Sequence, residues 1–184
     1  MGKRSLLAIL VLALMTPFLG GCQTEPKNET KKENLHEDVQ TALDRFKRED
    51  PSINELMSKS AGYAVLPSIA KAAFWVGGAY GKGEVFEAGT MTGYTDMTQA
   101  SVGFQWGGQE YAELLIFETK TALENFKNNK LELGANASAI VAKAGAAGQA
   151  KFENGIATIV MPKVGAMVEA AVGGQRFTYK PVGS

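Results

Sequence analysis

The sequence predicts an α+β fold, with a strongly curved antiparallel sheet or partly closed barrel, two N-terminal helices and one further short helix. Three observations predict it. Apolar residues between Leu35 and Phe46 repeat at helical spacing. After Ser60 the chain changes to short runs of β-branched and aromatic residues, separated by glycine or polar turns. Pairs of adjacent glycines recur inside these runs, as a sharply bending sheet requires.

Residues 1–21 have the pattern of a lipoprotein signal peptide. A start with lysine and arginine precedes an unbroken apolar run over residues 6–15. As a helix this run rises only about 15 Å, half of a hydrocarbon core, so it is too short to span a membrane. The sequence LGGC at residues 19–22 resembles the bacterial lipobox, which implies cleavage before Cys22, attachment of diacylglycerol to its thiol, and palmitate among the acyl groups of the mature protein. A plain secretory signal beside a chance cysteine is the alternative.

Residues 22–32 are expected to be a flexible tether between this anchor and a folded body. The stretch is polar and has no large apolar residue, so burial cannot offset the entropy of ordering it. The lipid on Cys22 would make the membrane a partner of the protein. Gln23 stands where some lipoproteins carry the aspartate that retains them in the inner membrane. We therefore expect export and anchoring to the bacterial outer membrane, on its periplasmic or surface face.

Residues 33–59 are expected to form two helices that cover a larger core. The apolar residues along one side of the first helix are Leu35, Val39, Leu43 and Phe46. Asp50 and Pro51 end that helix and start the second, with Asp50 as its N-cap. Near the end of the first helix, Arg45, Lys47 and Arg48 either offset the helix dipole on a solvated face or bind lipid headgroups.

Residues 60–184 are expected to be a β-rich body that forms one domain with residues 33–59. The runs that predict strands are 63–66, 74–76, 101–106, 114–117, 156–161 and 166–172. Thr121, with Glu124 three residues later, forms a capping-box pattern that predicts the further short helix. Residues 135–150 leave helix and turn open, because their alanines favour a helix and their glycines break it.

Three glycine pairs are expected to shape the sheet. Each pair has aromatic neighbours, and the pairs are Gly77 with Gly78, Gly107 with Gly108, and Gly173 with Gly174. Paired glycines weaken a strand unless the backbone bends sharply or approaches another closely. We therefore expect three bends of one curved sheet, with aromatic side chains in the space that the glycines leave.

Composition and motifs argue against several functions. The 19 Lys plus Arg balance 19 Asp plus Glu, whereas a nucleic-acid binder needs a surplus of cations on one face. With a single cysteine and a single histidine, the chain lacks partners for a zinc site, a disulfide framework or a catalytic triad. We expect no metal, no cofactor and no enzymatic activity. The enzymatic rival is a hydrolase that pairs Glu113 and Glu84 across a sheet, although solvated strand faces explain both carboxylates more simply.

From Ser60 onward the chain resembles the SYLF domain family. The segments that carry the likeness are residues 61–67 (AGYAVLP), 77–78 with 81–83 (GKG), 103–109 (GFQWGGQ), 133–135 (LGA) and 163–169 (KVGAMVE) before Gly173 and Gly174. The resemblance implies a compact α+β domain with a curved antiparallel sheet. It also implies phospholipid binding, since eukaryotic members bind phosphoinositides and other acidic phospholipids, while bacterial members are mostly exported lipoproteins. The chain departs from the family at residues 142–148, which replace a Gly-Pro turn, and at 91–99, which lack the usual tryptophan.

The leading hypothesis is a lipid-anchored, non-enzymatic envelope protein whose body binds acidic phospholipid. Lys71, Lys82 and Arg176 lie near the glycine pairs and are the candidate headgroup ligands. The alternative is a structural or antigenic surface module that contacts other envelope proteins.

Overall fold

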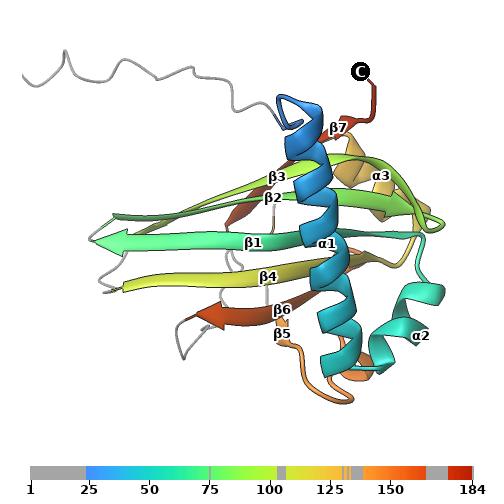
Figure 1. The fold of residues 1–184 in the computed structure, drawn as a ribbon. Coiled ribbons are helices and arrows are strands. Elements are labelled where there is room, and N and C mark those ends of the chain that lie inside the picture. The colour runs from blue at the N-terminus through green and yellow to red at the C-terminus, as the bar shows by residue number, and fades with distance from the viewer. Residues whose placement is uncertain are drawn as a thin grey trace, which may run out of the picture.

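The computed structural model describes residues 24–74, 76–102, 107–129, 131, 133, 139–164 and 174–183. These residues form an α+β fold, as predicted (Figure 1). The helices are α1 (Glu29–Glu49), α2 (Ser52–Ser58), α3 (Lys120–Lys127) and the short 3-10 helix η1 (Ala147–Gln149). The strands are β1 (Gly62–Phe74), β2 (Val76–Glu87), β3 (Thr90–Val102), β4 (Gly107–Phe117), β5 (Ile140–Val141), β6 (Ile156–Val164) and β7 (Gln175–Pro181).

The described strands form one open, mixed sheet. Its seven strands run in the order β5-β6-β4-β1-β2-β3-β7, so β5 and β7 are the edges. Neighbouring strands are antiparallel except β5 and β6, which are parallel. The partly closed barrel allowed by the sequence is therefore not confirmed, and the sheet is not purely antiparallel.

The sheet is covered on both faces. We call the face that carries α1 and α2 the outer face and the opposite face, which carries α3, the inner face (Figure 1). Along β4, Leu114 and Ile116 pack in the cluster that includes the α1 side chains, while Leu115 and Phe117 pack in the cluster that includes α3. Because successive side chains point to opposite faces, a strand buried on both faces has a continuous apolar run. That is why the run at 114–117 was recognisable in the sequence.

Helix α1 begins at Glu29 rather than at residue 33. Asn28 is its N-cap, and the Asn28 side chain accepts a hydrogen bond from the Lys31 amide at 3.0 Å. The predicted apolar stripe is present, since Val39, Leu43 and Phe46 are buried against the sheet. The first turns of α1 are therefore polar, and the second half of the helix makes its apolar contacts with the sheet.

The buried carboxylate of Asp50 ties the corner between α1 and α2 to the loop before η1. It accepts hydrogen bonds from the Ser52 amide at 3.1 Å, the Gly145 amide at 3.0 Å and the Ala147 amide at 2.6 Å. Burial opposes its charge, but these hydrogen bonds outweigh that effect and lower the pKa of Asp50. Pro51, not Asp50, occupies the N-cap position of α2, although the Asp50 side chain still bonds the first turn.

Helix α3 packs on the inner face and joins the sheet centre to its edge. Its N-cap is Thr119 rather than the predicted Thr121. Phe126 lies 4.9 Å from Phe117 of β4 and 5.7 Å from Phe177 of β7, measured between ring centroids. Because β7 lies at the edge and β4 lies inside the sheet, this aromatic cluster requires the sheet to curl over α3.

Two of the predicted glycine pairs face the same part of β1. Their backbone register places Ala73 between Gly77 and Gly107, and Ala72 between Gly78 and Gly108. A strip of residues with small or no side chains thus crosses β2, β1 and β4. Gly174 has a φ of 78°, which glycine adopts without strain, and Gly173 lies outside the described residues.

Among Gly78, Gly81 and Gly83, the β2 glycines whose surroundings the structure describes, the closest backbone approach occurs at Gly83, which is not one of the predicted pairs. A Cβ on Gly83 would lie 2.2 Å from the carbonyl oxygen of Val65, where β1 shifts register before Ser68. A Cβ on Gly78 would meet its nearest atom, the Gln99 carbonyl oxygen, at 3.5 Å, an ordinary contact.

We expect Gly83→Ala to destabilise the protein by about 2 kcal/mol or more, because the methyl group must displace the β1 backbone. The matched control, Gly78→Ala in the same strand, should change the free energy of unfolding by less than about 1 kcal/mol. Urea denaturation of both variants measures the difference. Equal losses would show that the sheet does not depend on this contact.

Candidate functional site

The three predicted headgroup ligands lie on different faces of the sheet. Lys71 in β1 is 9% exposed and points to the inner face, two residues after the buried Ile69. Lys82 in β2 and Arg176 in β7 point to the outer face. The ammonium of Lys82 lies 3.4 Å from the Asp96 carboxylate, and Arg176 is exposed. The structure therefore brings Lys82 and Arg176 onto one face and leaves Lys71 apart.

The chain that precedes α1 lies against this outer face. Thr24 and Thr178 of β7 bring their hydroxyl oxygens to 3.1 Å. The Lys82 ammonium donates a hydrogen bond to the Thr24 carbonyl oxygen at 3.3 Å. The expected flexible tether, residues 22–32, thus contains a segment that contacts β2 and β7.

Glu25 fastens the same segment with two ion pairs. Its carboxylate lies 2.8 Å from the Lys180 ammonium of β7 and 2.7 Å from the Lys32 ammonium of α1. Hydrogen bonds from Lys180 and Lys32 lower the pKa of Glu25 to about 2. The Glu25 carboxylate therefore stays ionised at physiological pH, and its two ion pairs do not change with pH in that range.

A pocket of about 570 Å³ lies beside Arg176, and we call it the β3–β7 pocket. Its lining residues are Thr98, Gln99, Ala100, Leu133, Gly174 and Arg176. Arg176 of β7 pairs in register with Thr98 of β3. Two positions further along, Thr178 pairs with Asp96, and Thr178 is the residue that contacts Thr24. The pocket therefore combines a guanidinium, polar side chains and apolar surface next to the docked N-terminal segment.

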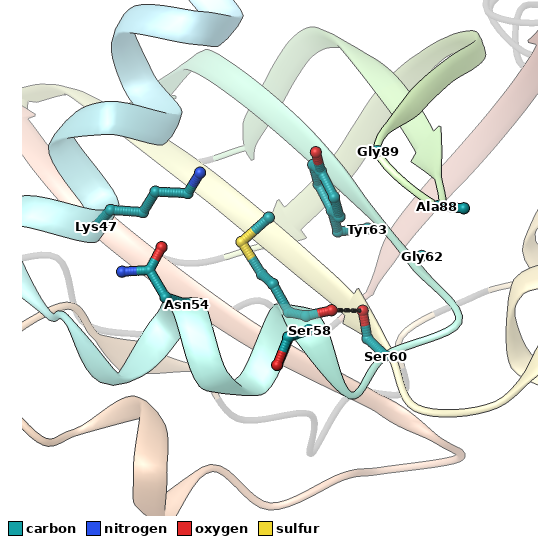
Figure 2. Close-up of a pocket in the computed structure, with 9 residues that line it drawn as sticks. Lys47, Asn54, Ser58, Ser60, Gly62, Tyr63, Ala88 and Gly89 are labelled. Carbon is teal, nitrogen blue, oxygen red and sulfur yellow. Dashed lines mark hydrogen bonds between the residues drawn. The ribbon is translucent and has the colours of Figure 1, made fainter.

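A second pocket of about 350 Å³ lies at the other end of α1, between α2, the start of β1 and the β2–β3 turn. Figure 2 shows Lys47 and Tyr63 on its two sides. The Tyr63 ring stacks on Phe86 with centroids 5.0 Å apart. The turn contains Ala88 with a φ of 49° and Gly89 with a φ of 79°. Lys47 belongs to the basic group for which the sequence left lipid contact open.

Glu113 is the centre of a buried polar group on the inner face. Its side chain is fully buried, and the Gln175 amide nitrogen donates to Glu113 Oε2 at 2.8 Å and to the Tyr111 hydroxyl at 3.3 Å. Among the described residues, neither Glu113 Oε1 nor Gln175 Oε1 has a hydrogen-bond partner. Burial raises the pKa of Glu113 to about 7, although the bond from Gln175 opposes the shift. Burial thus favours the neutral, protonated form of the Glu113 carboxyl below about pH 7.

Glu84, the expected partner of Glu113 in a hydrolase, lies on the opposite face. Its carboxylate bonds His36 Nδ1 of α1 at 2.9 Å. Burial raises the pKa of Glu84, and His36 opposes the shift. With the sheet between them, the two carboxylates do not form an acid–base pair. The carboxylate of Glu84 instead holds the first half of α1 on the sheet.

Three further expectations concern the lipidation site, a metal site and a membrane-spanning helix. Cys22 lies outside the described residues. Among the residues that the structure does describe, no three or more His, Cys, Asp or Glu side chains gather as a metal site. No helix in this part of the chain is long and apolar enough to cross a membrane.

The described residues define a small α+β domain with two surface pockets, and comparison with known proteins shows which family it resembles. Residues 98–180 match the Ysc84 (SYLF) family model, described as Las17-binding protein actin regulator. Beta cell expansion factor A of Aeromonas veronii is 28% identical over 139 residues, which cover 74% of this chain and 52% of that protein. The chain thus spans about half the length of the curated relative it matches. These matches confirm the predicted resemblance, and the matched part of the chain is a SYLF-type domain.

The matched region separates the two pockets. Every residue that lines the β3–β7 pocket falls within residues 98–180, whereas the pocket beside Lys47 is built from residues 47–89. Sequence reasoning selected Arg176 and Gly174 but missed Thr98, Gln99, Ala100 and Leu133. No local pattern in the sequence marked these four residues, because residues 98–100 have no apolar alternation.

The buried Glu113 predicts a pH-dependent stability. The folded protein keeps its proton up to a pKa of about 7, whereas the unfolded chain loses it near 4.5. The contribution is therefore complete below pH 4.5 and is lost as the pH rises through 7, up to about 3 kcal/mol in all. Glu113→Gln should remove this loss and be more stable than the unmodified protein at pH 8. Thermal unfolding between pH 4.5 and 8 measures it.

Glu110→Gln is the matched control on the same strand. Hydrogen bonds from Ser68 and Lys163 lower the pKa of Glu110, so this half-buried carboxylate stabilises the fold above the unfolded pKa. Its replacement should weaken the protein at pH 8, the opposite sign. A wild-type pH profile that Glu113→Gln leaves unchanged would contradict the assignment.

Proposed function

We propose that this protein is a lipid-anchored component of the bacterial envelope whose SYLF-type domain binds acidic phospholipid and catalyses no reaction. The observation that carries the proposal is the β3–β7 pocket, which lies entirely within the family match and includes Arg176.

The chemistry of the β3–β7 pocket suits a phospholipid headgroup. A guanidinium pairs with phosphate through two parallel hydrogen bonds and stays charged at every relevant pH. Thr98 and Gln99 add polar groups, while Ala100 and Leu133 add apolar surface for the first carbons of the acyl chains. Lys71 faces the filled interior, so we assign it no part in headgroup binding.

The anchoring part of the proposal rests on the sequence around Cys22. Two or more acyl chains on one cysteine hold a protein on a bilayer far better than one chain. The near-neutral charge of the sequence supplies no general attraction to anionic lipid, so the covalent anchor would do most of the holding. Export and outer-membrane location follow from the same signal.

The separation of Glu113 from Glu84 supports a non-enzymatic role. Each carboxylate has its own structural partner, Gln175 on the inner face and His36 on the outer face. General acid–base chemistry needs both groups within reach of one substrate. The hydrolase hypothesis therefore loses the geometry on which it depended.

We expect Arg176→Glu to weaken binding to vesicles that contain phosphatidylglycerol by about tenfold, because a cation at the phosphate becomes a repelling anion. The measurement is vesicle flotation of the unacylated mature chain, residues 22–184 with Cys22→Ser. Arg48→Glu, the same charge change on the exposed end of α1, is the control and should have little effect. Unchanged flotation of Arg176→Glu, or equal losses in both variants, would contradict the site.

The anchor has a separate test. In the exported full-length protein, Cys22→Ser should move the chain from the detergent phase to the aqueous phase in a phase-separation assay. Mass spectrometry of the unmodified protein should find a diacylated residue 22 at the N-terminus. A mature N-terminus elsewhere, or detergent partition without the cysteine, would refute the anchoring.

A further inference from the structure

We infer that the outer face of β3 and β7 is the surface held against the bilayer, with the headgroup layer of acidic phospholipids as its partner. The inference rests on the proposed lipid at Cys22. It adds an orientation that neither the family match nor the anchor supplies, because a lipid on a long free tether leaves a protein body free to turn.

The position of Thr24 fixes where the anchor emerges. Two residues of extended chain span at most about 7 Å, so Cys22 lies within about that distance of Thr24. Thr24 itself is bound to Thr178 of β7 and to Lys82 of β2. The acyl chains therefore enter the membrane beside β7. A free tether over residues 22–32 would instead allow a separation of about 35 Å.

The docked segment is held from three elements, which makes the orientation specific. Glu25 pairs with Lys180 of β7 and Lys32 of α1, while Lys82 of β2 holds the Thr24 carbonyl oxygen. The Glu25 side chain is only 17% exposed, so its ion pairs are partly shielded from water. Removing Glu25 should therefore free the segment without touching the core of the fold.

The groups around this point fit a membrane interface. Tyr80 of β2 is 38% exposed, and its hydroxyl lies 3.3 Å from Asp96. Tyr80, Thr98 and Arg176 are register partners in one row across β2, β3 and β7. Tyrosine is favoured at the headgroup level of a bilayer, where its ring meets apolar surface and its hydroxyl meets water.

The charge of the face agrees with an anionic surface. The cations of the docked segment and of the face beside it include Lys27, Lys32, Lys82, Arg176 and Lys180, and the carboxylates there are Glu25, Glu29, Glu84 and Asp96. Glu25, Glu29 and Asp96 are each paired with a lysine, and Glu84 bonds His36. The face thus carries a small positive excess beside the β3–β7 pocket, where a headgroup phosphate can reach Arg176.

The other end of the molecule is then held away from the lipid. Helix α1 has 21 residues and so is about 31 Å long. Its second half packs on the sheet together with α2 (Figure 1). The pocket beside Lys47 and Tyr63 lies at that end, and the opposite sheet edge, β5, leads into the exposed residue Lys143.

Fluorescence quenching in reconstituted vesicles tests the orientation. The acylated full-length protein carries a single probe at Thr98→Cys or at Lys143→Cys, since acylation blocks the thiol of Cys22. The vesicles contain phosphatidylethanolamine, phosphatidylglycerol and a lipid with a nitroxide on its headgroup. We expect the probe at residue 98 to be quenched at least about threefold more than the probe at residue 143. Equal quenching, or stronger quenching at residue 143, overturns the inference.

Glu25→Gln separates the docked segment from the anchor. This variant should remain on the vesicles but lose most of the difference between the two probes, while Glu33→Gln, which removes an exposed carboxylate of the adjoining helix α1, should keep it. Sedimentation with vesicles is measured on each sample. If the unmodified protein attaches without a difference between the probes, or if Glu25→Gln keeps the difference, the orientation is wrong and the anchoring stands; if the unmodified protein does not attach at all, both are wrong.

Discussion

The structure depends on the curl of its sheet, and the hydrogen bond from Gln175 to Glu113 shows that curl most directly. Gln175 belongs to the edge strand β7 and Glu113 to β4, and β1, β2 and β3 lie between them in the sheet. The two side chains meet only if the sheet curls, and Gly83 allows the backbones to approach at the bend. Helix α3 fills the remaining space with Phe126. The curl therefore buries the inner face, whose side chains stabilise the fold and are not accessible to a ligand.

Burial of the inner face leaves function to the outer face and the edges. The second half of α1 covers the outer face through apolar contacts, whereas its first half is held by polar ones, such as that between His36 and Glu84. Over β3 and β7 the outer face is exposed at Thr98, Arg176 and Thr178. The β3–β7 pocket and the docked segment meet there, within reach of an anchor at Cys22. One surface can thus serve both headgroup binding and attachment.

The sequence predicted best where packing is strongest. The α+β class, the apolar stripe of α1 and the run of β4 followed from periodicity, because each buries a regular pattern. Most of β3 was missed because the buried inner residues Thr95 and Gln99 are polar, so the strand has no apolar alternation. The whole of β7 was missed because only two of its residues, Phe177 and Tyr179, are large and apolar. Arg176 was chosen for its place near glycines. Its pocket, and the separation of Lys71 from it, depend on strand register, which no local pattern encodes.

The central claim is that a curled scaffold without a reaction centre carries a phospholipid beside Arg176. Native mass spectrometry of the protein released from its own membranes in mild detergent tests it most directly. The account predicts a retained phospholipid mass on the acylated protein and a sharply reduced one in Arg176→Glu, with the fold intact in both. A protein that carries no phospholipid, or a variant that carries as much as the unmodified protein, would contradict it.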